Sequence, residues 1–312
     1  MNKPTCAIVV LNYNGSTLLN QFLESVVIAA KRATICDVRV VLLDNASTDD
    51  SIPWTRTHFH SVEVFSAPSN RYLYSYNWVA GILKDDLLLL LNNDIEMEPD
   101  CLDPLFETLL NDPQVFSVTP RMYYMDRITP NSGRWRGRFV RGLLEPKLTN
   151  TNEGIAPTLF PCGGAMLVRR SDFLTIGGFD ELYYPVYWED VDVGYRAWKR
   201  NRPSLCQPAS IMYHMGSASI MLDPTYAEHK SAKIFRNVWL FTWRNVVNPR
   251  ILGANLYWTA RHYTALQRRH ERVLTTAYRQ AFPLIRTALV ARKRDDKLRK
   301  LSDDNILQCV NL

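Results

Sequence analysis

The stretch Ala7-Ile8-Val9-Val10-Leu11, followed at once by Asn12-Tyr13-Asn14-Gly15, decides the fold of this 312-residue chain. Five consecutive apolar residues without polar alternation are typical of a strand buried on both faces, as in a parallel sheet. Helical spacing of apolar residues follows over Leu18–Ala30, and Val38–Leu43 is the next apolar run. Strand, helix and strand in this order predict an α/β protein with a doubly wound, mostly parallel sheet flanked by helices.

The same pattern continues outward from this stretch. The helix after the first strand is expected to begin with Ser16 as its N-cap. Residues Arg121–Thr158 hold several prolines and glycines and an Arg-rich stretch, so we expect a long loop or extended hairpin beside the sheet. Four further short apolar runs are expected to be strands: Val62–Phe65, Leu87–Leu91, Val115–Val118 and Ala165–Val168.

The composition argues for a folded core and against a membrane span. With 46% hydrophobic and 22% charged residues, the chain does not fit a disordered, collagen-like or coiled-coil protein. No stretch approaches the roughly 18–20 uninterrupted apolar residues of a membrane-spanning helix, and the N-terminal apolar run is too short for a signal peptide. Six cysteines without zinc-ligand spacing indicate reduced thiols, so a cytoplasmic location is expected.

Charge divides the chain into two parts. Through Glu228 there are 20 Lys and Arg against 26 Asp and Glu, whereas from His229 onward there are 17 against 5, a net charge of +12. We therefore expect a catalytic domain over residues 1–226 and a basic, aromatic-rich helical extension over residues 227–312, with Leu301–Leu312 as a frayed end.

The function of the basic extension stays open between two interpretations. Helices with Arg and Lys on one side and Trp, Phe and Leu on the other are typical of peripheral contact with an anionic membrane, here its inner face. Alternatively, the aromatic residues pack the helices onto the catalytic domain and the charges face water.

Polar residues follow three of the expected strands, where ligands of such sheets bind. We expect the three loops to lie side by side along one edge of the sheet. Asp44 can accept a hydrogen bond from a pyrimidine base that Tyr13 flanks, and Asp94 is an oxygen ligand suited to Mg²⁺ or Mn²⁺ bound to a diphosphate. The residues expected to bind this nucleotide in these loops are Asn12, Tyr13, Asn14, Asp44, Asn45, Ser47 and Asn93.

A later segment combines glycines with adjacent carboxylates. Gly163-Gly164 lets a ligand approach the backbone closely. Trp188-Glu189-Asp190 presents two neighbouring acids at the start of a helix expected over Val191–Lys199. Helix capping would account for one of these acids, because carboxylates are favoured at a helix N-terminus, but it does not explain the whole segment.

These segments together resemble the family 2 glycosyltransferases over about residues 5–220. The similarity is greatest to bacterial rhamnosyl- and galactofuranosyltransferase-like members. It implies the GT-A fold and an inverting enzyme of polysaccharide or cell-envelope biosynthesis that uses a divalent metal. A sugar would move from a UDP- or dTDP-linked nucleotide sugar donor to a hydroxyl of a glycan or lipid-linked acceptor.

The resemblance also implies roles for particular residues. Asn92-Asn93-Asp94 occupies the place of the family's metal-binding D-x-D, and the His214 of Tyr213–Ser217 would complete the metal site. Gly163 and Gly164 would line the donor sugar and acceptor. Asp190, the second acid of its motif, would be the catalytic base beside Glu189. Trp188 would either stack on a sugar face or pack in the core.

Two departures from the family pattern concern this site. Asn92 is neutral where the family often has a carboxylate, so metal binding would rest on Asp94, His214 and the diphosphate oxygens. The stretch Asn70–Asn77 is bulky and aromatic where many relatives are glycine-rich, although Arg71 could reach a phosphate.

Other classes of protein are also compatible with parts of the sequence. A sugar nucleotidyltransferase would share the sheet and the metal-binding aspartate, but Asn12–Gly15 is not its glycine-rich phosphate loop. A degenerate, non-catalytic relative would bind nucleotide without turnover. The basic C-terminal part would suit nucleic acid, yet the acidic remainder holds no recognition motif, so we expect no nucleic-acid partner.

Overall fold

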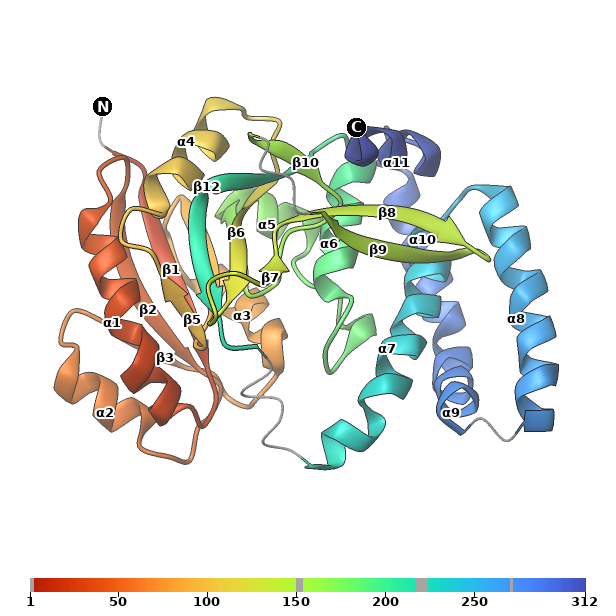
Figure 1. Ribbon diagram of the computed structural model, residues 1–312, viewed down its shortest axis with the longest axis horizontal. Coiled ribbons are helices and arrows are strands. Elements are labelled where there is room, and N and C mark those ends of the chain that lie inside the picture. Colours follow the sequence, from red (N-terminus) through yellow and green to blue (C-terminus); the bar gives the residue numbers. More distant parts are fainter. Residues whose placement is uncertain (1–2, 150–153, 217–223, 270–271) are drawn as a thin grey trace.

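A computed structural model of the chain describes residues 3–149, 154–216, 224–269 and 272–312 (Figure 1). A large sheet stands beside a group of C-terminal helices, with further helices on both faces of the sheet. The strands are β1 (Thr5–Asn12), β2 (Asp37–Asp44), β3 (Glu63–Ser66), β4 (Leu87–Asn92), β5 (Ile95–Met97), β6 (Ser117–Tyr124), β7 (Pro130–Ser132), β8 (Arg134–Val140), β9 (Leu143–Thr149), β10 (Ala156–Thr158), β11 (Ala165–Arg169) and β12 (Ser204–His214). The helices are α1 (Ser16–Arg32), α2 (Ser51–His58), η1 (Tyr72–Tyr74), α3 (Ser75–Ile82), α4 (Leu102–Asn111), α5 (Arg170–Ile176), η2 (Glu181–Tyr183), α6 (Glu189–Lys199), α7 (Pro224–Asn245), α8 (Pro249–Arg269), α9 (Arg272–Ala281), η3 (Phe282–Leu284), α10 (Ile285–Asp296) and α11 (Asp303–Asn311).

The main sheet brings the ends of the early strands to one edge. Its strand order is β10-β12-β6-β11-β4-β1-β2-β3, with β5 beside β12 and β7 beside β6. β1 pairs in parallel with β2 and β4, so Asn12 lies opposite Asp44, and Leu11 opposite Asn92. All six strands expected from the sequence are present, and the predicted mostly parallel α/β sheet is confirmed.

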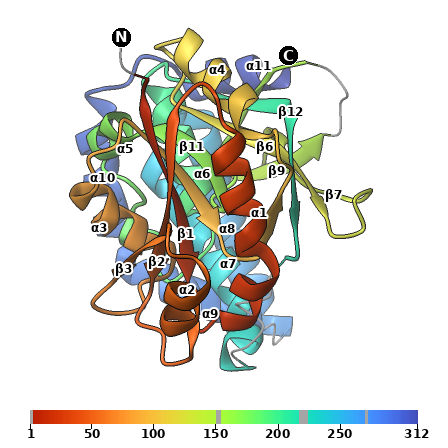
Figure 2. The same cartoon turned by 90° about the vertical axis from the view of Figure 1, so that its left-hand side faces the viewer.

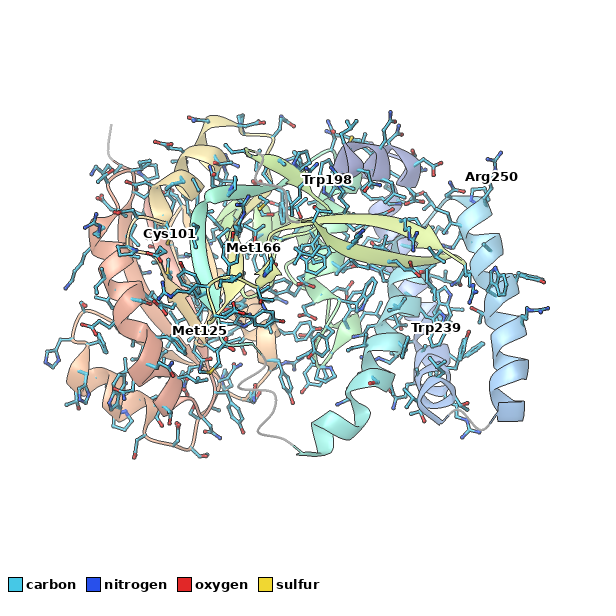
Figure 3. All side chains as sticks on the ribbon, viewed as in Figure 1. Cys101, Met125, Met166, Trp198, Trp239 and Arg250 are labelled. Carbon is cyan, nitrogen blue, oxygen red and sulfur yellow. The ribbon has the colours of Figure 1, made fainter. Side chains whose placement is uncertain are left out.

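Successive side chains along each strand point to opposite faces of the sheet, and in the central strands both sets are apolar, which explains why helices cover both faces. In β4 the odd-numbered leucines face α1 and α4, whereas Leu88 and Leu90 face α3 and α5, so the strand is buried on both sides. Cys101 and Met166 belong to these two opposite hydrophobic clusters (Figure 3). The unbroken apolar run of a parallel strand is the direct consequence of this two-sided burial.

The C-terminal helices pack against the outer side of α6. Val193 and Ala197 of α6 face the sheet, whereas Tyr195 and Trp198 face a third cluster that includes α7, α9, α10 and α11. The view along the sheet shows these helices behind it, on the side away from α1 (Figure 2). Helix α6 thus lies between the sheet and the C-terminal helices, and the expected boundary at residues 226/227 falls inside α7.

The expected hairpin is present, but the prediction of a frayed C-terminus is wrong. β8 and β9 pair as an antiparallel hairpin that extends toward α8 (Figure 1). Residues 303–311 form α11, whose Ile306 and Val310 are fully buried. Ser302 caps this helix by accepting a hydrogen bond from the Asn305 backbone N–H at 3.1 Å, and the apolar residues four apart face the core.

The structure also bears on the expected N-cap of the first helix and on the expected reduced cysteines. Ser16 is the first residue of α1 rather than its N-cap, because its backbone N–H donates to the Asp49 carboxylate at 3.0 Å. All six cysteines are free thiols, four of them buried. Across the part of the chain with described structure, no helix has the length and apolar character that a membrane span requires.

Candidate active site

The loops after β1 and β2 are joined by a buried hydrogen-bond network. Asn12 and Asp44 are almost completely buried, and the Asn12 amide donates to Asp44 Oδ1 at 3.0 Å and to Ser47 Oγ at 3.2 Å. Ser47 donates to the same carboxylate through its backbone N–H at 2.9 Å and its hydroxyl at 2.6 Å. In this structure the Asp44 oxygens hold the loop through three hydrogen bonds, which leaves the carboxylate capacity for one further donor.

The loop after β4 joins this network, which confirms that the three loops are neighbours. The Asn93 amide donates to Asn12 Oδ1 at 2.8 Å. A Cβ at Gly15 would lie 2.3 Å from Asn93 Nδ2 and 2.5 Å from Asn12 Oδ1, so only glycine allows this approach. Tyr13 projects outward with 41% of its surface exposed, beside Asn14, whose side chain accepts the Thr48 backbone N–H.

Asn45 and Arg71 connect the edge of the site to the aromatic stretch Asn70–Asn77. Asn45 is buried, donates to the Tyr72 carbonyl at 3.1 Å and accepts from the Ser75 hydroxyl. Arg71 forms an ion pair with Glu181 at 2.8 Å and lies over the Tyr184 ring. The structure therefore brings Asn45 into the loop network, whereas the Arg71 guanidinium is engaged with the segment before α6.

Asp94 and His214 are brought together by β12, a strand that the sequence pattern did not predict. β12 pairs with β5 so that His214 lies opposite Ile95, and His214 Nε2 is 3.1 Å from Asp94 Oδ1. Asp94 is buried, and its carbonyl accepts the Met215 backbone N–H. Ser217, at the end of the sequence segment that suggested this site, lies outside the described residues.

The chemistry of this pair fits a divalent cation. His214 Nδ1 is 2.9 Å from the Asn131 amide oxygen, so a neutral imidazole that donates there carries its lone pair on Nε2. Two acceptors, Nε2 and a carboxylate oxygen, then face each other, and a proton or a cation between them removes the repulsion. Within the described ranges no group of three His, Cys, Asp or Glu residues gathers for a metal, so a cation here would need ligands from the substrate.

Asp190 meets the glycine pair at the N-terminus of α6. The Gly163 backbone N–H donates to Asp190 Oδ2 at 3.2 Å, and a Cβ at Gly163 would lie 3.1 Å from Asp190 Cβ. Gly164 accepts the Asn92 backbone N–H at 2.9 Å and has no room for a side chain beside the Asn92 amide. This chain of contacts links Asp190 through two glycines to the end of β4, two residues before Asp94.

Burial changes the acidity of both carboxyl groups in this motif. It raises the pKa of Asp190 to about 6, although two backbone N–H groups stabilise the ionised form. Burial and the neighbouring Asp190 charge raise the pKa of Glu189 well above its ordinary value. Glu189 Oε2 is buried and has no hydrogen-bond partner among the described residues. Asp190 can thus exchange a proton near neutral pH, whereas burial favours the neutral form of Glu189.

Trp188 packs in the core rather than facing a ligand. It is 9% exposed, and its ring centroid lies 5.3 Å from that of Phe241 on α7. Of the two uses considered for this residue, the structure shows packing, and Trp188 is not placed to stack on a sugar.

Sequence reasoning did not identify two asparagines that bear on the site. Asn131, which hydrogen-bonds His214, lies on β7 within the segment that was predicted only as a loop or hairpin. The two amide N–H groups of Asn237 on α7 lie within hydrogen-bond distance of the carbonyls of Tyr183, Val186 and Tyr187, just before Trp188. Its signal was a neutral polar residue directly before the apolar run Val238–Phe241, a place where a buried hydrogen-bonding side chain can occur.

Comparison with known proteins agrees with this geometry. Residues 7–177, more than half of the chain, match the family model described as "Glycosyl transferase family 2". The chain is 28% identical over 294 residues to the N-acetylglucosaminyl-diphospho-decaprenol L-rhamnosyltransferase of Mycobacterium tuberculosis, covering 83% of this chain and 90% of that protein.

Solved structures with the GT-A fold resemble the whole chain or its larger part. A mannosyltransferase from Pyrobaculum calidifontis, in complex with GDP-Man and Mn²⁺, has a TM-score of 0.54 at 16% identity and covers 96% of this chain and 86% of its own. GalNAc-T7, solved with UDP, GalNAc and Mn²⁺, has a TM-score of 0.55 at 19% identity and covers 67% of this chain, which spans 43% of that protein. These likenesses show the fold, and together with the family match they establish that the chain belongs to glycosyl transferase family 2.

Proposed function

We propose that the chain is an inverting glycosyltransferase that moves a sugar from a UDP- or dTDP-linked donor to a hydroxyl of a glycan or lipid-linked acceptor. One observation carries this proposal: the Asp190 carboxylate lies at the Gly163-Gly164 turn, which is bonded to the end of β4 beside Asp94 and His214. A carboxylate that can take up a proton is therefore connected by a few contacts to a candidate site for the diphosphate. Direct displacement of the diphosphate by the acceptor hydroxyl needs both groups close together.

In the proposed reaction Asp190 removes the acceptor proton. A sugar hydroxyl is a weak nucleophile, and general-base help is typically worth about 10²–10⁴ in rate. As the proton moves to Asp190, the acceptor oxygen forms a bond to the anomeric carbon, and the bond from that carbon to the donor diphosphate breaks. The nucleoside diphosphate leaves with the electron pair of that bond. Attack from the face opposite the leaving group inverts the anomeric centre.

Glu189 helps to set the protonation state of the base. Because Glu189 stays neutral, it adds no second negative charge beside Asp190. Two adjacent ionised acids would raise each other's pKa further, and Asp190 would then be protonated at neutral pH. The buried neighbour thus leaves Asp190 available as a base.

Asp94 and His214 are the residues that would hold a divalent cation, Mn²⁺ or Mg²⁺. Such an ion supplies Lewis-acid stabilisation to the charge that develops on a leaving diphosphate. Asn131 keeps the His214 ring oriented toward Asp94, as outer partners of metal-binding histidines commonly do. Asn92 adds no charge here, so we expect weak metal binding unless the donor diphosphate is present.

The donor would bind across the three joined loops. Tyr13 is exposed there and Asn14 and Ser47 lie beside it, so an aromatic ring and short polar side chains face the expected position of the nucleoside. Buried hydrogen bonds among Asn12, Asp44 and Asn93 hold these loops together. These residues shape the donor site in this proposal, and Asp44 keeps the capacity to accept a hydrogen bond from the base.

A lipid-linked acceptor would place the enzyme at a membrane surface. The M. tuberculosis relative is named for transfer to a decaprenol-linked saccharide, which supports this acceptor class for the present chain. α8 exposes Leu256 and Tyr257, at 72% and 58%, and α10 exposes Val290 beside the exposed Lys293. With the net charge of +12 after Glu228, we propose that these helices contact anionic lipid.

Sedimentation with lipid vesicles tests the membrane contact. We expect the protein to bind phosphatidylglycerol vesicles and not phosphatidylcholine vesicles, and we expect Leu256→Asp with Tyr257→Asp to weaken this binding. Ile128→Asp, an exposed apolar residue of the β6–β7 loop, is the control. Equal binding of all three proteins would count against the proposed surface.

Turnover of a nucleotide-sugar panel with Mn²⁺ or with a chelator tests the proposed reaction. We expect one UDP- or dTDP-sugar to raise the melting temperature and to be consumed when a lipid-linked or glycan acceptor is added. Binding without consumption under every condition would support the non-catalytic alternative. Formation of a nucleotide sugar from a sugar phosphate and a nucleoside triphosphate would support a nucleotidyltransferase.

A further inference from the structure

The segment that delivers Asp190 has an unfavourable backbone conformation. Tyr187 and Trp188 have φ values of 71° and 77°, in the left-handed region, immediately before Glu189 begins α6. For bulky residues with a Cβ, this region is sterically unfavourable. Something outside the segment must hold this conformation, because relaxation of either residue would change where α6 begins and where Asp190 points.

Asn237 of α7 provides the contacts that hold it. This residue is fully buried, and its amide nitrogen lies 3.0 Å from the Tyr183 carbonyl, 3.0 Å from that of Val186 and 2.7 Å from that of Tyr187. The amide oxygen accepts from Arg236 Nε at 2.8 Å, which fixes the orientation of the amide group. A buried backbone carbonyl is costly to leave without a donor, so loss of the Asn237 side chain would weaken the turn, although the Tyr183 carbonyl also accepts from Arg236.

Two further residues on the same face of α7 contact the adjoining parts of α6. Phe241 packs against Trp188 and against Tyr195, with ring centroids 5.3 Å and 5.1 Å apart. Asn245 donates to Asp192 Oδ1 at 2.7 Å. Residues four apart lie on one face of a helix, so Asn237, Phe241 and Asn245 form a continuous stripe along the turn and the first part of α6.

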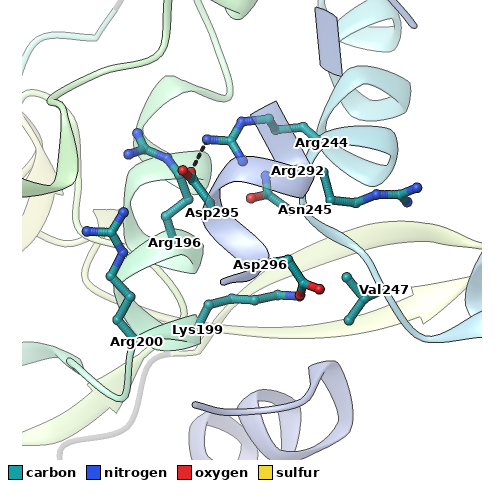
Figure 4. Close-up of a pocket in the computed structure, with 9 residues that line it drawn as sticks. All are labelled: Arg196, Lys199, Arg200, Arg244, Asn245, Val247, Arg292, Asp295 and Asp296. Atoms are coloured by element: carbon teal, nitrogen blue, oxygen red, sulfur yellow. Dashed lines mark hydrogen bonds and ion pairs between the residues drawn. The ribbon is translucent and has the colours of Figure 1, made fainter. Parts of the chain in front are cut away.

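Charged groups fix this stripe relative to α6 and α10. Arg244 of α7 forms an ion pair with Asp180, before the turn. It forms a second ion pair with Asp295 of α10 (Figure 4). Arg244, Asn245 and Asp295 are among the residues that line a small cavity between α6, α7 and α10. Arg196 is itself bonded to Asp192 and to the carbonyls of Ile176 and Gly178, which leaves the start of α6 little freedom to move.

We infer that Asn237 is a positioning residue for transfer. It belongs to the C-terminal helices, and it holds the left-handed turn that aims Asp190 at the acceptor. This inference rests on the proposed function of Asp190 as the base. It makes the C-terminal region part of the catalytic unit, in addition to any contact it makes with a membrane. A displacement of about 1 Å at a reacting group can cost 10²-fold in rate, so a change at Asn237 is expected to act on kcat.

The experiment compares Asn237→Leu with Thr242→Val in the full-length chain. Both changes replace a buried hydrogen-bonding residue of α7 by an apolar one of similar size. Thr242 donates to the Gly142 carbonyl of the hairpin at 3.3 Å and not to the turn before α6. Folding is checked by circular dichroism, donor affinity by calorimetry, and kcat with both substrates saturating.

We expect Asn237→Leu to lower kcat by about 10- to 100-fold, with the dissociation constant of the donor changed less than about twofold. Thr242→Val is expected to keep kcat within about twofold of the wild type. The acid limb of the kcat–pH profile should move to lower pH in Asn237→Leu only, because a relaxed turn exposes Asp190 to water while Glu189 and Cys162 remain its titratable neighbours. A smaller folded fraction alone would not move that limb.

Two outcomes would overturn the inference while leaving the proposed function intact: wild-type kcat in Asn237→Leu, or equal loss of kcat in both variants with an unmoved acid limb. Failure of the proposed function is a different result, namely no transfer by the wild type, or full transfer by Asp190→Asn. If Asn237→Leu does not fold, Asn237→Ser keeps one short donor and is judged by the same criteria.

Discussion

At the scale of single residues, the site depends on one carboxyl group with altered acidity. Burial raises the pKa of Asp190 to about 6, while its contact with the Gly163 N–H keeps it oriented. A group with this pKa is mostly ionised at neutral pH yet basic enough to accept a proton from a hydroxyl. We therefore expect Asp190 to affect both the rate of the proposed transfer and the stability of the fold.

The rate should follow the ionisation of Asp190. We expect kcat to fall about tenfold for each pH unit below about 6 and to be level from there to pH 8, because only the carboxylate can act as the base. Steady-state kinetics with saturating substrates from pH 4.5 to 8 measure this. A profile that is flat down to pH 4.5 would show that no group with a raised pKa limits the reaction.

Stability should change in the opposite direction to activity when Asp190 is replaced. The folded pKa lies above the unfolded value of about 3.9, so the stabilisation from the protonated carboxyl is complete below about pH 4 and is lost as the pH rises through 6. Asp190→Asn cannot ionise, and we expect it to raise the free energy of unfolding by about 1–2 kcal/mol at pH 8. The gain should shrink toward zero near pH 4. Urea unfolding at both pH values measures it, and a destabilised variant at pH 8 would contradict the assignment.

His214 should be needed for the metal-dependent part of donor binding. We expect His214→Ala to lose most of the extra rise in melting temperature that Mn²⁺ gives in the presence of the donor, because Asp94 alone provides one protein ligand. His58→Ala, an exposed histidine of α2, is the matched control. Retention of the full Mn²⁺ effect in His214→Ala would exclude this histidine as a ligand.

At the scale of elements, the sequence was most informative where burial imposed a simple pattern. The five leucines Leu87–Leu91 and the run Ala7–Leu11 gave strands at the right positions, because both faces of each strand are covered. β12 was missed because Pro208 and several polar residues interrupt it, and the pairing with β6 shifts between Gln207 and Ile211. That missed strand carries His214, so the closeness of Asp94 and His214 could be expected only from the family resemblance.

At the C-terminus the error was of the opposite kind, because a helix is present where a frayed end was expected. Ser302, with Asp303 and Asp304 in the first turn, is an ordinary helix start, and Ile306 and Val310 are four residues apart. The segment was nevertheless predicted as frayed, because its length was short and its partners lie far away in the sequence. The left-handed turn at Tyr187 and Trp188 was likewise unpredictable, since its cause is a side chain of α7.

Asp303 should be the residue through which α11 stabilises the molecule. It is fully buried and accepts hydrogen bonds from the Tyr195 hydroxyl at 2.7 Å and from the Val247 and Asn248 backbone N–H groups at 2.8 Å, beside Lys199 at 3.0 Å. We expect Asp303→Ala to lower the free energy of unfolding by about 3–4 kcal/mol, because it leaves a buried cation and several donors unpaired.

The adjacent Asp304→Ala is the control for this prediction. Asp304 is exposed and accepts a hydrogen bond from the Asn248 side chain at 2.9 Å, so we expect a change within about 0.5 kcal/mol. Equal effects of the two substitutions in urea unfolding would show that α11 is not held through Asp303.

At the scale of the whole molecule, two parts with opposite charge share the helix that carries the base. One side of α6 packs on the sheet that bears the donor loops, and the other side packs on the basic C-terminal helices. Under the proposed function, the acceptor would arrive from the side of the C-terminal helices and the donor from the loop side, with Asp190 between them.

Donor affinity and transfer rate, measured together on Asp190→Asn, test this account most directly. We predict that the dissociation constant of the nucleotide sugar stays within about twofold of the wild type while kcat falls by at least about 10²-fold, the usual value of a general base. Wild-type turnover in this variant would contradict the account, and so would loss of donor binding in a protein that remains folded.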